Sequence, residues 1–185
     1  MTDLTQQEKS CLLKLAKDSI RSDLFNTPLE IFEAKNLQNL NKIKATFVTL
    51  KEKGELRGCI GNLLPRDPLY VSVIKNAKSA AFNDLRFERL KPDEFDPLDI
   101  EISILSPVET FEYQSLDQLL DYLDTNHPGV VLTKDNQQAT FLPQVWLDLA
   151  DPVSFLSQLS LKAGLAQDAW KDNAAIGIFE IDIVR

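Results

Sequence analysis

The stretch of the sequence best suited to chemistry runs from Glu55 to Gly61 and reads Glu-Leu-Arg-Gly-Cys-Ile-Gly. If this stretch is a β-strand, alternation places Arg57, Cys59 and Gly61 on one face. A cation beside a thiol favours the thiolate, which is the nucleophilic form of cysteine. Gly58 and Gly61 carry no side chain, so a ligand or another backbone could approach closely. From this pattern alone, a packed structural thiol is the simpler interpretation, because free cysteine is among the most buried residue types. A reactive Cys59 activated by Arg57 is the alternative.

A catalytic cysteine normally works with a base, and the sequence offers few candidates. The single histidine is His127, in the turn-like run from Asn126 to Gly129, where a surface turn residue is the simpler interpretation. Glu101 lies on the polar face of a predicted strand, and a solvated position is the simplest interpretation there. A carboxylate base and an ion pair with Arg57 are the alternatives for Glu101.

Metal and cofactor sites are not indicated. One histidine and two separated cysteines, Cys11 and Cys59, suit neither a soft-ligand metal site nor a disulfide framework. The sequence contains no Walker loop, Rossmann glycine fingerprint or nucleophile elbow. We therefore expect no metal and no cofactor. Asn83, Asp84 and Arg86 follow the end of a predicted helix, where they offer turn caps or a polar rim for binding.

The elements expected to position these residues begin with a hairpin formed by residues 45–50 and 55–62. Asp67 and Pro68 then predict a helix start, with Asp67 as the N-cap and Pro68 as the first helical residue. The apolar stripe of this helix continues to about Phe82. Residues 99–104 alternate cleanly, with the isoleucines on one face, which predicts a half-buried strand.

The same order of elements occurs a second time. Residues 129–133 and 139–142 predict a second hairpin, Asp151 and Pro152 open a helix that Gly164 ends, and residues 176–184 alternate as one closing strand. A capping box, Thr5-Gln6-Gln7-Glu8, begins an N-terminal helix over about 6–23. The predicted fold is α+β, with two antiparallel-sheet subdomains covered by helices. The hairpin–helix–strand unit is duplicated at about 45–105 and 129–184 in a single domain, 1–185.

Charge and hydropathy restrict the partners and the compartment. The chain has 185 residues and a net charge of -8, and residues 92–133 hold ten acidic residues without a lysine or arginine. Such a surface repels phosphate backbones, so we expect no nucleic-acid partner. No apolar run reaches the ~20 residues of a membrane helix, and the N-terminus lacks the pattern of a signal peptide. We expect no membrane contact and a cytoplasmic location.

A series of segments, in a fixed order, resembles a known family. The motif residues are Phe47 to Lys51, Gly54 and Leu56 to Gly61. They are followed by Ser79 to Asp84, Arg86-Phe87, Leu98 to Leu105 with Pro107, Gly129 to Leu132, Leu142 to Val145, and Lys162 to Leu165 with Trp170. Together they resemble the AMMECR domain family, including the protein A type of the AmmeMemoRadiSam system, over essentially the whole chain from about Leu12. Two positions depart from the family pattern. Leu85 stands where proline is frequent, and His127-Pro128-Gly129 replaces the usual entry to the second hairpin.

The resemblance implies a compact α+β domain of two antiparallel-sheet subdomains. It also implies a role centred on the motif cysteine, Cys59, in a pathway with Memo-type and radical-SAM proteins. We expect a small cysteine-centred enzyme or ligand-modifying protein, with Arg57 and Glu101 as further catalytic candidates. The binding candidates are Gly58, Gly61, Asn83, Asp84 and Arg86. The alternative is a non-catalytic module that binds proteins or a small ligand.

Overall fold

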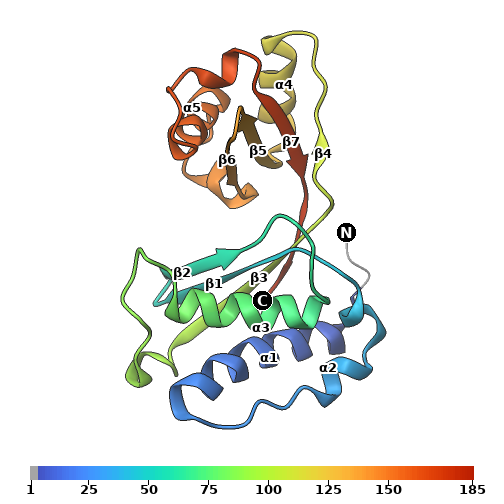
Figure 1. The fold of residues 1–185 in the computed structure, drawn as a ribbon, viewed down its shortest axis with the longest axis vertical. Helices are drawn as coiled ribbons and strands as arrows, with labels where there is room; N and C mark the ends of the chain where they lie inside the picture. The colour runs from blue at the N-terminus through green and yellow to red at the C-terminus, as the bar shows by residue number, and fades with distance from the viewer. Residues whose placement is uncertain (1–3) are drawn as a thin grey trace. The chain divides into compact units, whose positions relative to one another are not determined.

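The computed structural model describes residues 4–185, which fold into two compact units (Figure 1). The first unit contains the residues up to Ser106 together with Asp182–Arg185, and the second contains Pro107–Ile181. That the two units act as one domain stays a prediction. Among the described residues, no helix combines the length and the apolar character needed to cross a bilayer.

The first unit is a four-stranded antiparallel sheet with helices on one face. Its elements are α1 (Gln6–Phe25), α2 (Phe32–Asn36), a 3-10 turn (Gln38–Asn41), β1 (Thr46–Glu52), β2 (Glu55–Gly61), α3 (Leu69–Phe82), a 3-10 turn (Pro92–Glu94), β3 (Leu98–Leu105) and β8 (Ile181–Val184). The strand order is β2-β1-β3-β8, so β2 is an edge strand. The predicted capping box is confirmed, because the Thr5 hydroxyl accepts from the Glu8 N–H and the Glu8 carboxylate accepts from the Thr5 N–H.

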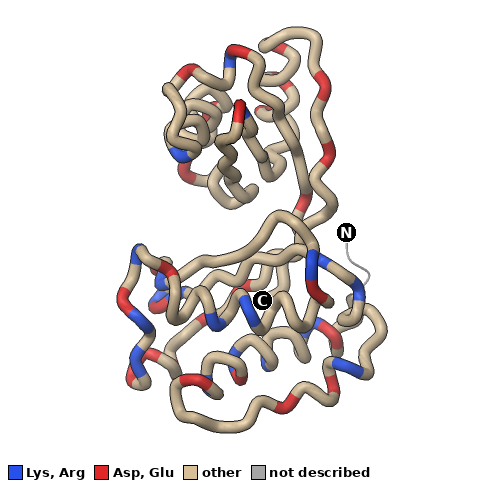
Figure 2. Tube along the Cα trace, in the orientation of Figure 1, with Lys and Arg blue, Asp and Glu red and all other residues tan. Residues whose placement is uncertain are grey.

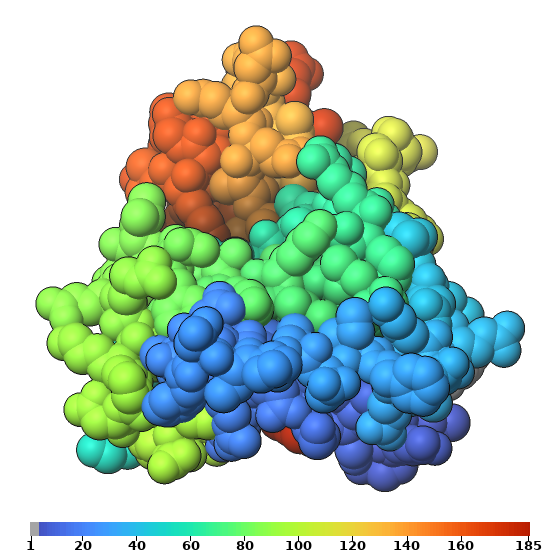
Figure 3. Space-filling view, turned by 60° about the horizontal axis from the view of Figure 1, so that its bottom comes forward, coloured from blue at the N-terminus to red at the C-terminus, as the bar shows by residue number. Residues whose placement is uncertain are grey.

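The core of the first unit lies between the sheet and its two long helices. In Figure 1, α3 lies against the sheet and α1 lies against α3. Figure 3 shows α1 and the segment after it forming the outer surface of this unit. Val48 and Leu50 of β1 and Ile102 of β3 are fully buried on the helix-facing side. Side chains alternate along a strand, so Thr49 lies on the opposite face.

The second unit repeats this plan at a smaller size. Its elements are β4 (Glu109–Thr110), α4 (Leu116–Asn126), β5 (Gly129–Lys134), β6 (Gln137–Phe141), a 3-10 turn (Pro143–Leu147), α5 (Pro152–Lys162), a 3-10 turn (Ala169–Lys171) and β7 (Ala175–Phe179), and the strand order is β4-β7-β5-β6. The carboxylate of Asp151 caps α5, and Gly164 follows that helix at a φ of 76°, both as the sequence predicts. Trp146 stacks on the buried Phe155 at 3.7 Å between ring centroids.

The two sheets share one topology. In each unit a hairpin is followed by a helix and then by a strand that pairs with the first strand of the hairpin, β3 with β1 and β7 with β5. The predicted α+β fold with a duplicated hairpin–helix–strand unit is therefore confirmed. Charge is divided unequally, because residues 107–181 contain eleven acidic residues and three lysines, whereas Lys and Arg gather in the first unit (Figure 2).

Two predicted boundaries are wrong. Residues 176–184 form two strands, because pairing breaks at Glu180, after which β8 joins the first sheet while β7 belongs to the second. The alternating pattern continues through the break, so it does not reveal a change of partner strand. Helix α3 begins one residue late, with Pro68 rather than Asp67 as N-cap. The Asp67 carboxylate instead pairs with Lys75 at 2.8 Å.

Candidate functional site

Cys59 lies in the edge strand β2, partly buried and not in a disulfide. Its backbone N–H donates to Asp84 Oδ2 at 2.9 Å, and its carbonyl accepts from Arg86 Nη2 at 3.1 Å. Two side chains from the loop after α3 thus take the backbone groups that an edge strand would present to another strand. The same contacts fix the backbone that carries the thiol.

Asp84 and Arg86 form a bidentate ion pair, with Arg86 Nε at 2.9 Å from Oδ1 and Nη2 at 2.7 Å from Oδ2. The Asp84 side chain is only 4% exposed. The hydrogen bond from Arg86 lowers the pKa of Asp84 to about 2, although burial opposes this shift. The pKa of Arg86 is raised mainly by the bond to Asp84, and attraction to Cys59 contributes. Arg86 is therefore a permanent cation in the field of the Cys59 thiol.

The sulfur atom has a hydrogen-bond donor on the neighbouring strand. Thr49 Oγ1 donates to Cys59 Sγ at 3.4 Å. The register pairs Thr49 with Cys59 on one side and with Glu101 on the other, so the three residues form a row across β2, β1 and β3. Sequence reasoning missed Thr49, although a hydroxyl that donates to sulfur stabilises negative charge there.

Glu101 is not on a solvated face, so the simplest sequence interpretation is wrong. The residue is 5% exposed, and its Oε2 accepts from Arg185 Nε at 2.7 Å, with Lys51 Nζ at 3.6 Å. A buried carboxylate needs such partners. Ser103 is also fully buried, so β3 is covered on both faces there rather than half-buried. The alternative ion pair with Arg57 is wrong as well, because the Arg57 guanidinium pairs with Glu94.

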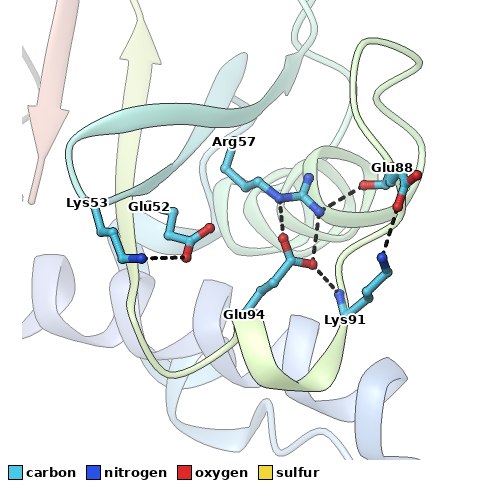
Figure 4. A network of polar contacts seen from close by, with 6 residues as sticks. All are labelled: Glu52, Lys53, Arg57, Glu88, Lys91 and Glu94. Atoms are coloured by element: carbon cyan, nitrogen blue, oxygen red, sulfur yellow. Dashed lines mark hydrogen bonds and ion pairs between the residues drawn. The ribbon is translucent and has the colours of Figure 1, made fainter.

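Arg57 occupies a β-bulge. Leu50 pairs with Gly58 and Lys51 pairs with Leu56, which leaves Arg57 as the extra residue. Its Nε and Nη2 donate to the two carboxylate oxygens of Glu94 at 2.7 and 3.1 Å (Figure 4). The alternation that would place Arg57 and Cys59 on one face therefore does not hold. The structure places the guanidinium of Arg86 at the cysteine instead.

The two motif glycines are surrounded by the protein's own atoms. A Cβ at Gly58 would lie 2.3 Å from the carbonyl oxygen of Ala80 in α3, and one at Gly61 would lie 2.3 Å from Cγ of Phe47. The backbone of α3 thus approaches Gly58 closely, which is one of the two possibilities that the sequence leaves open. Asn83 is exposed at the C-terminal end of α3, where its N–H donates to the Ser79 carbonyl. Ligand binding by these residues stays a prediction.

His127 lies in the second unit, exposed at the C-cap of α4 with a φ of 46°. Its ring stacks on Trp146 at 5.0 Å. The predicted turn position is confirmed. Within residues 4–185, no group of three or more His, Cys, Asp or Glu side chains has an arrangement that could hold a metal ion.

Comparison with known proteins assigns the chain to a family. A family model described as AMMECR1 matches residues 13–184. The chain belongs to the AMMECR1 family. It is 40% identical over 129 residues to a protein of Aquifex aeolicus, which covers 68% of this chain and 66% of that protein. It is 33% identical over 177 residues to a protein of Methanothermobacter thermautotrophicus, and this match covers 91% of this chain and 88% of that protein.

A solved structure supports the same assignment. The crystal structure of the uncharacterized protein PH0010 from Pyrococcus horikoshii matches with a TM-score of 0.88 and 29% sequence identity. The match covers 97% of this chain and 92% of that chain. The resemblance identified from the motif residues is thus confirmed, and the AMMECR1 fold is the fold described above.

Proposed function

We propose that this AMMECR1 protein is a small cysteine-centred enzyme or ligand-modifying protein. Cys59 is its nucleophile or covalent anchor, and Arg86 is the cation that compensates the thiolate. The observation that carries the proposal is the surroundings of Cys59. Thr49 Oγ1 donates to the sulfur at 3.4 Å, and the Arg86 guanidinium is held 3.1 Å from the Cys59 carbonyl. A donor and a cation together favour the reactive thiolate, and the negative charge of Asp84, which holds Arg86, offsets part of this effect.

The roles follow from what each side chain contacts. Asp84 orients Arg86 through two hydrogen bonds and holds the Cys59 N–H, so it is a positioning residue. Arg86 is half-exposed, and it would hold an anionic group of a ligand whose electrophilic atom the Cys59 sulfur attacks. His127, whose ring stacks on Trp146, has no part in the proposal.

Leu85 favours a second candidate, a non-catalytic module that binds a partner protein. Its side chain is 100% exposed between Asp84 and Arg86, two residues that bind the backbone of Cys59. A large apolar side chain beside a polar cluster is suited to the centre of a protein interface. The Memo-type and radical-SAM proteins implied by the family resemblance are the partners we propose for this case.

The charge preference of Cys59 alkylation tests the first candidate. In Cys11→Ser protein, we expect the ratio of the alkylation rate with iodoacetate to the rate with neutral iodoacetamide to be higher for Cys59 than for a free thiol. The reason is that Arg86 attracts the carboxylate of iodoacetate. Arg86→Gln should lower this rate ratio to that of a free thiol, and Cys59→Ser should remove labelling. A rate ratio that is the same with and without Arg86 would contradict the proposed role of the guanidinium. If instead only Leu85→Ser, and not Cys59→Ser, abolishes binding of a purified partner, the second candidate is favoured.

A further inference from the structure

The loop segment 84–94, which follows α3, is fastened to β2 near both of its ends. Near its start, Asp84 and Arg86 bind the backbone of Cys59. Near its end, Glu94 accepts two hydrogen bonds from Arg57, whose Nη2 also donates to the carbonyl of Glu88 at 2.9 Å (Figure 4). Arg57 and Cys59, which are separated by one residue in β2, thus hold the two ends of this segment.

The contact between Arg57 and Glu94 has the features of a strong restraint. It is bidentate, and the two side chains are only 13% and 22% exposed, so solvent screens it weakly. Their hydrogen bond is the main cause that raises the pKa of Arg57 and lowers the pKa of Glu94, so both are charged at neutral pH. Glu94 also accepts from the N–H of Lys91 at 2.7 Å, and the Phe87 ring lies within 5.9 Å of Arg57 and 5.5 Å of Arg86.

The bulge explains why Arg57 reaches this segment. An extra residue in an edge strand re-aims its side chain, and bulges are frequent beside functional sites. We infer that Arg57 is a positioning residue, which acts on Cys59 only by holding segment 84–94 and hence Arg86 in place. The inference deepens the proposed function and rests on it for the chemistry of the thiol. The restraint on the segment can be measured independently of that chemistry.

The first measurement is hydrogen exchange of the Cys59 amide, which donates to Asp84. In Cys11→Ser protein, Arg57→Gln and Glu94→Gln should each accelerate this exchange about tenfold or more, the factor expected for losing a charged hydrogen bond. The double variant should exchange no faster than Arg57→Gln alone, because that change already removes the bonds from Arg57 to both the Glu94 carboxylate and the Glu88 carbonyl. Glu88→Gln is the matched control. It removes an exposed pair with Lys91 but keeps the carbonyl that Arg57 uses, so exchange should not change.

The second measurement is the midpoint of the Cys59 alkylation rate against pH. Arg57→Gln and Glu94→Gln should raise the midpoint by roughly half a pH unit or more, because a loosened Arg86 compensates the thiolate less well. In an Arg86→Gln background, Arg57→Gln should add nothing. A shift of equal size without Arg86 would mean that Arg57 acts on the thiol directly, and it would overturn the inference.

The two measurements separate this inference from the proposed function. Unchanged amide exchange in folded Arg57→Gln and Glu94→Gln proteins overturns the restraint, whatever the thiol does. Faster exchange with an unchanged alkylation midpoint supports the restraint and contradicts the proposed role of Arg86. If Arg57→Gln does not fold, the exchanged pair Arg57→Glu with Glu94→Arg serves instead. Exchange in that variant should be slower than in Glu94→Gln, and equal or faster exchange would overturn the restraint.

Discussion

Asp84→Asn should destabilise the protein in a way that depends on pH. Asparagine keeps an oxygen that can accept from the Cys59 N–H, but it loses the charge that pairs with Arg86. Folding lowers the pKa of Asp84 from 3.8 to about 2, and each pKa unit corresponds to about 1.4 kcal/mol, so the carboxylate contributes about 2 kcal/mol at neutral pH. Because the folded pKa is the lower one, this stabilisation is present above about pH 4 and is lost as the pH falls through 2.

Urea unfolding of the wild type and of Asp84→Asn, from pH 7 down to pH 3, measures this contribution. The free-energy difference should be about 2 kcal/mol at pH 7 and fall to about half of that near pH 3. Asp93→Asn, an exposed acid in the neighbouring turn, is the control and should change stability by less than about 0.5 kcal/mol. A difference for Asp84→Asn that is the same at every pH would refute the argument, because it would not come from the charge.

Three further predictions concern the packing around the site. Gly58→Ala should cost about 2 kcal/mol or more in urea unfolding, because the backbone carbonyl of Ala80 cannot move away from a Cβ 2.3 Å distant; a cost below about 0.5 kcal/mol would show that α3 yields. Leu85→Ser should leave the unfolding free energy within about 0.5 kcal/mol, because the side chain is fully exposed; a larger loss would reveal a packing role. Cys11 is buried, and burial raises the pKa of its thiol, so peptide mapping should find it alkylated only after denaturation; rapid labelling of native protein at Cys11 would contradict this.

The sequence contains enough information for most of the fold. Turn residues and alternation locate both hairpins, and the capping residues Thr5, Glu8 and Asp151 locate two helix starts. These signals depend only on residues that are close in the sequence, so they can be recognised without knowing the rest of the fold. The division of residues 176–184 between two sheets is not local. It depends on which strand lies alongside, and the alternating side chains are the same in either case.

The candidate site was only partly predictable, and the bulge at Arg57 is the main reason. The hairpin begins by pairing Glu52 with Glu55, and without a bulge the same register would place Val48 opposite Cys59. The extra residue shifts the register by one, which brings Thr49 to the cysteine. Gly58, beside Arg57, is the one signal in the residue pattern, because a glycine within a strand can mark a bulge as well as the close approach of another backbone. Cys59 could be chosen from its motif, whereas the partners of Arg57 depend on how a later loop folds back.

The burial of Glu101 shows a second limit of pattern reasoning. Period-two alternation correctly separates Glu101 from the isoleucines of β3, but it does not say whether the other face meets solvent. Arg185, the residue that pairs with Glu101, comes from the end of the chain, 84 positions away. Such long-range pairs have no local signature.

The alkylation rate of Cys59 against pH, in folded Cys11→Ser protein treated with iodoacetamide, tests the central claim most directly. The surroundings of the sulfur predict labelling without denaturant, with a midpoint below the ordinary thiol value of about 8.5. Cys59→Ser protein provides the blank. Labelling that begins only when the protein unfolds, or a midpoint at or above the ordinary value, would contradict a reactive thiolate and leave the partner-binding candidate.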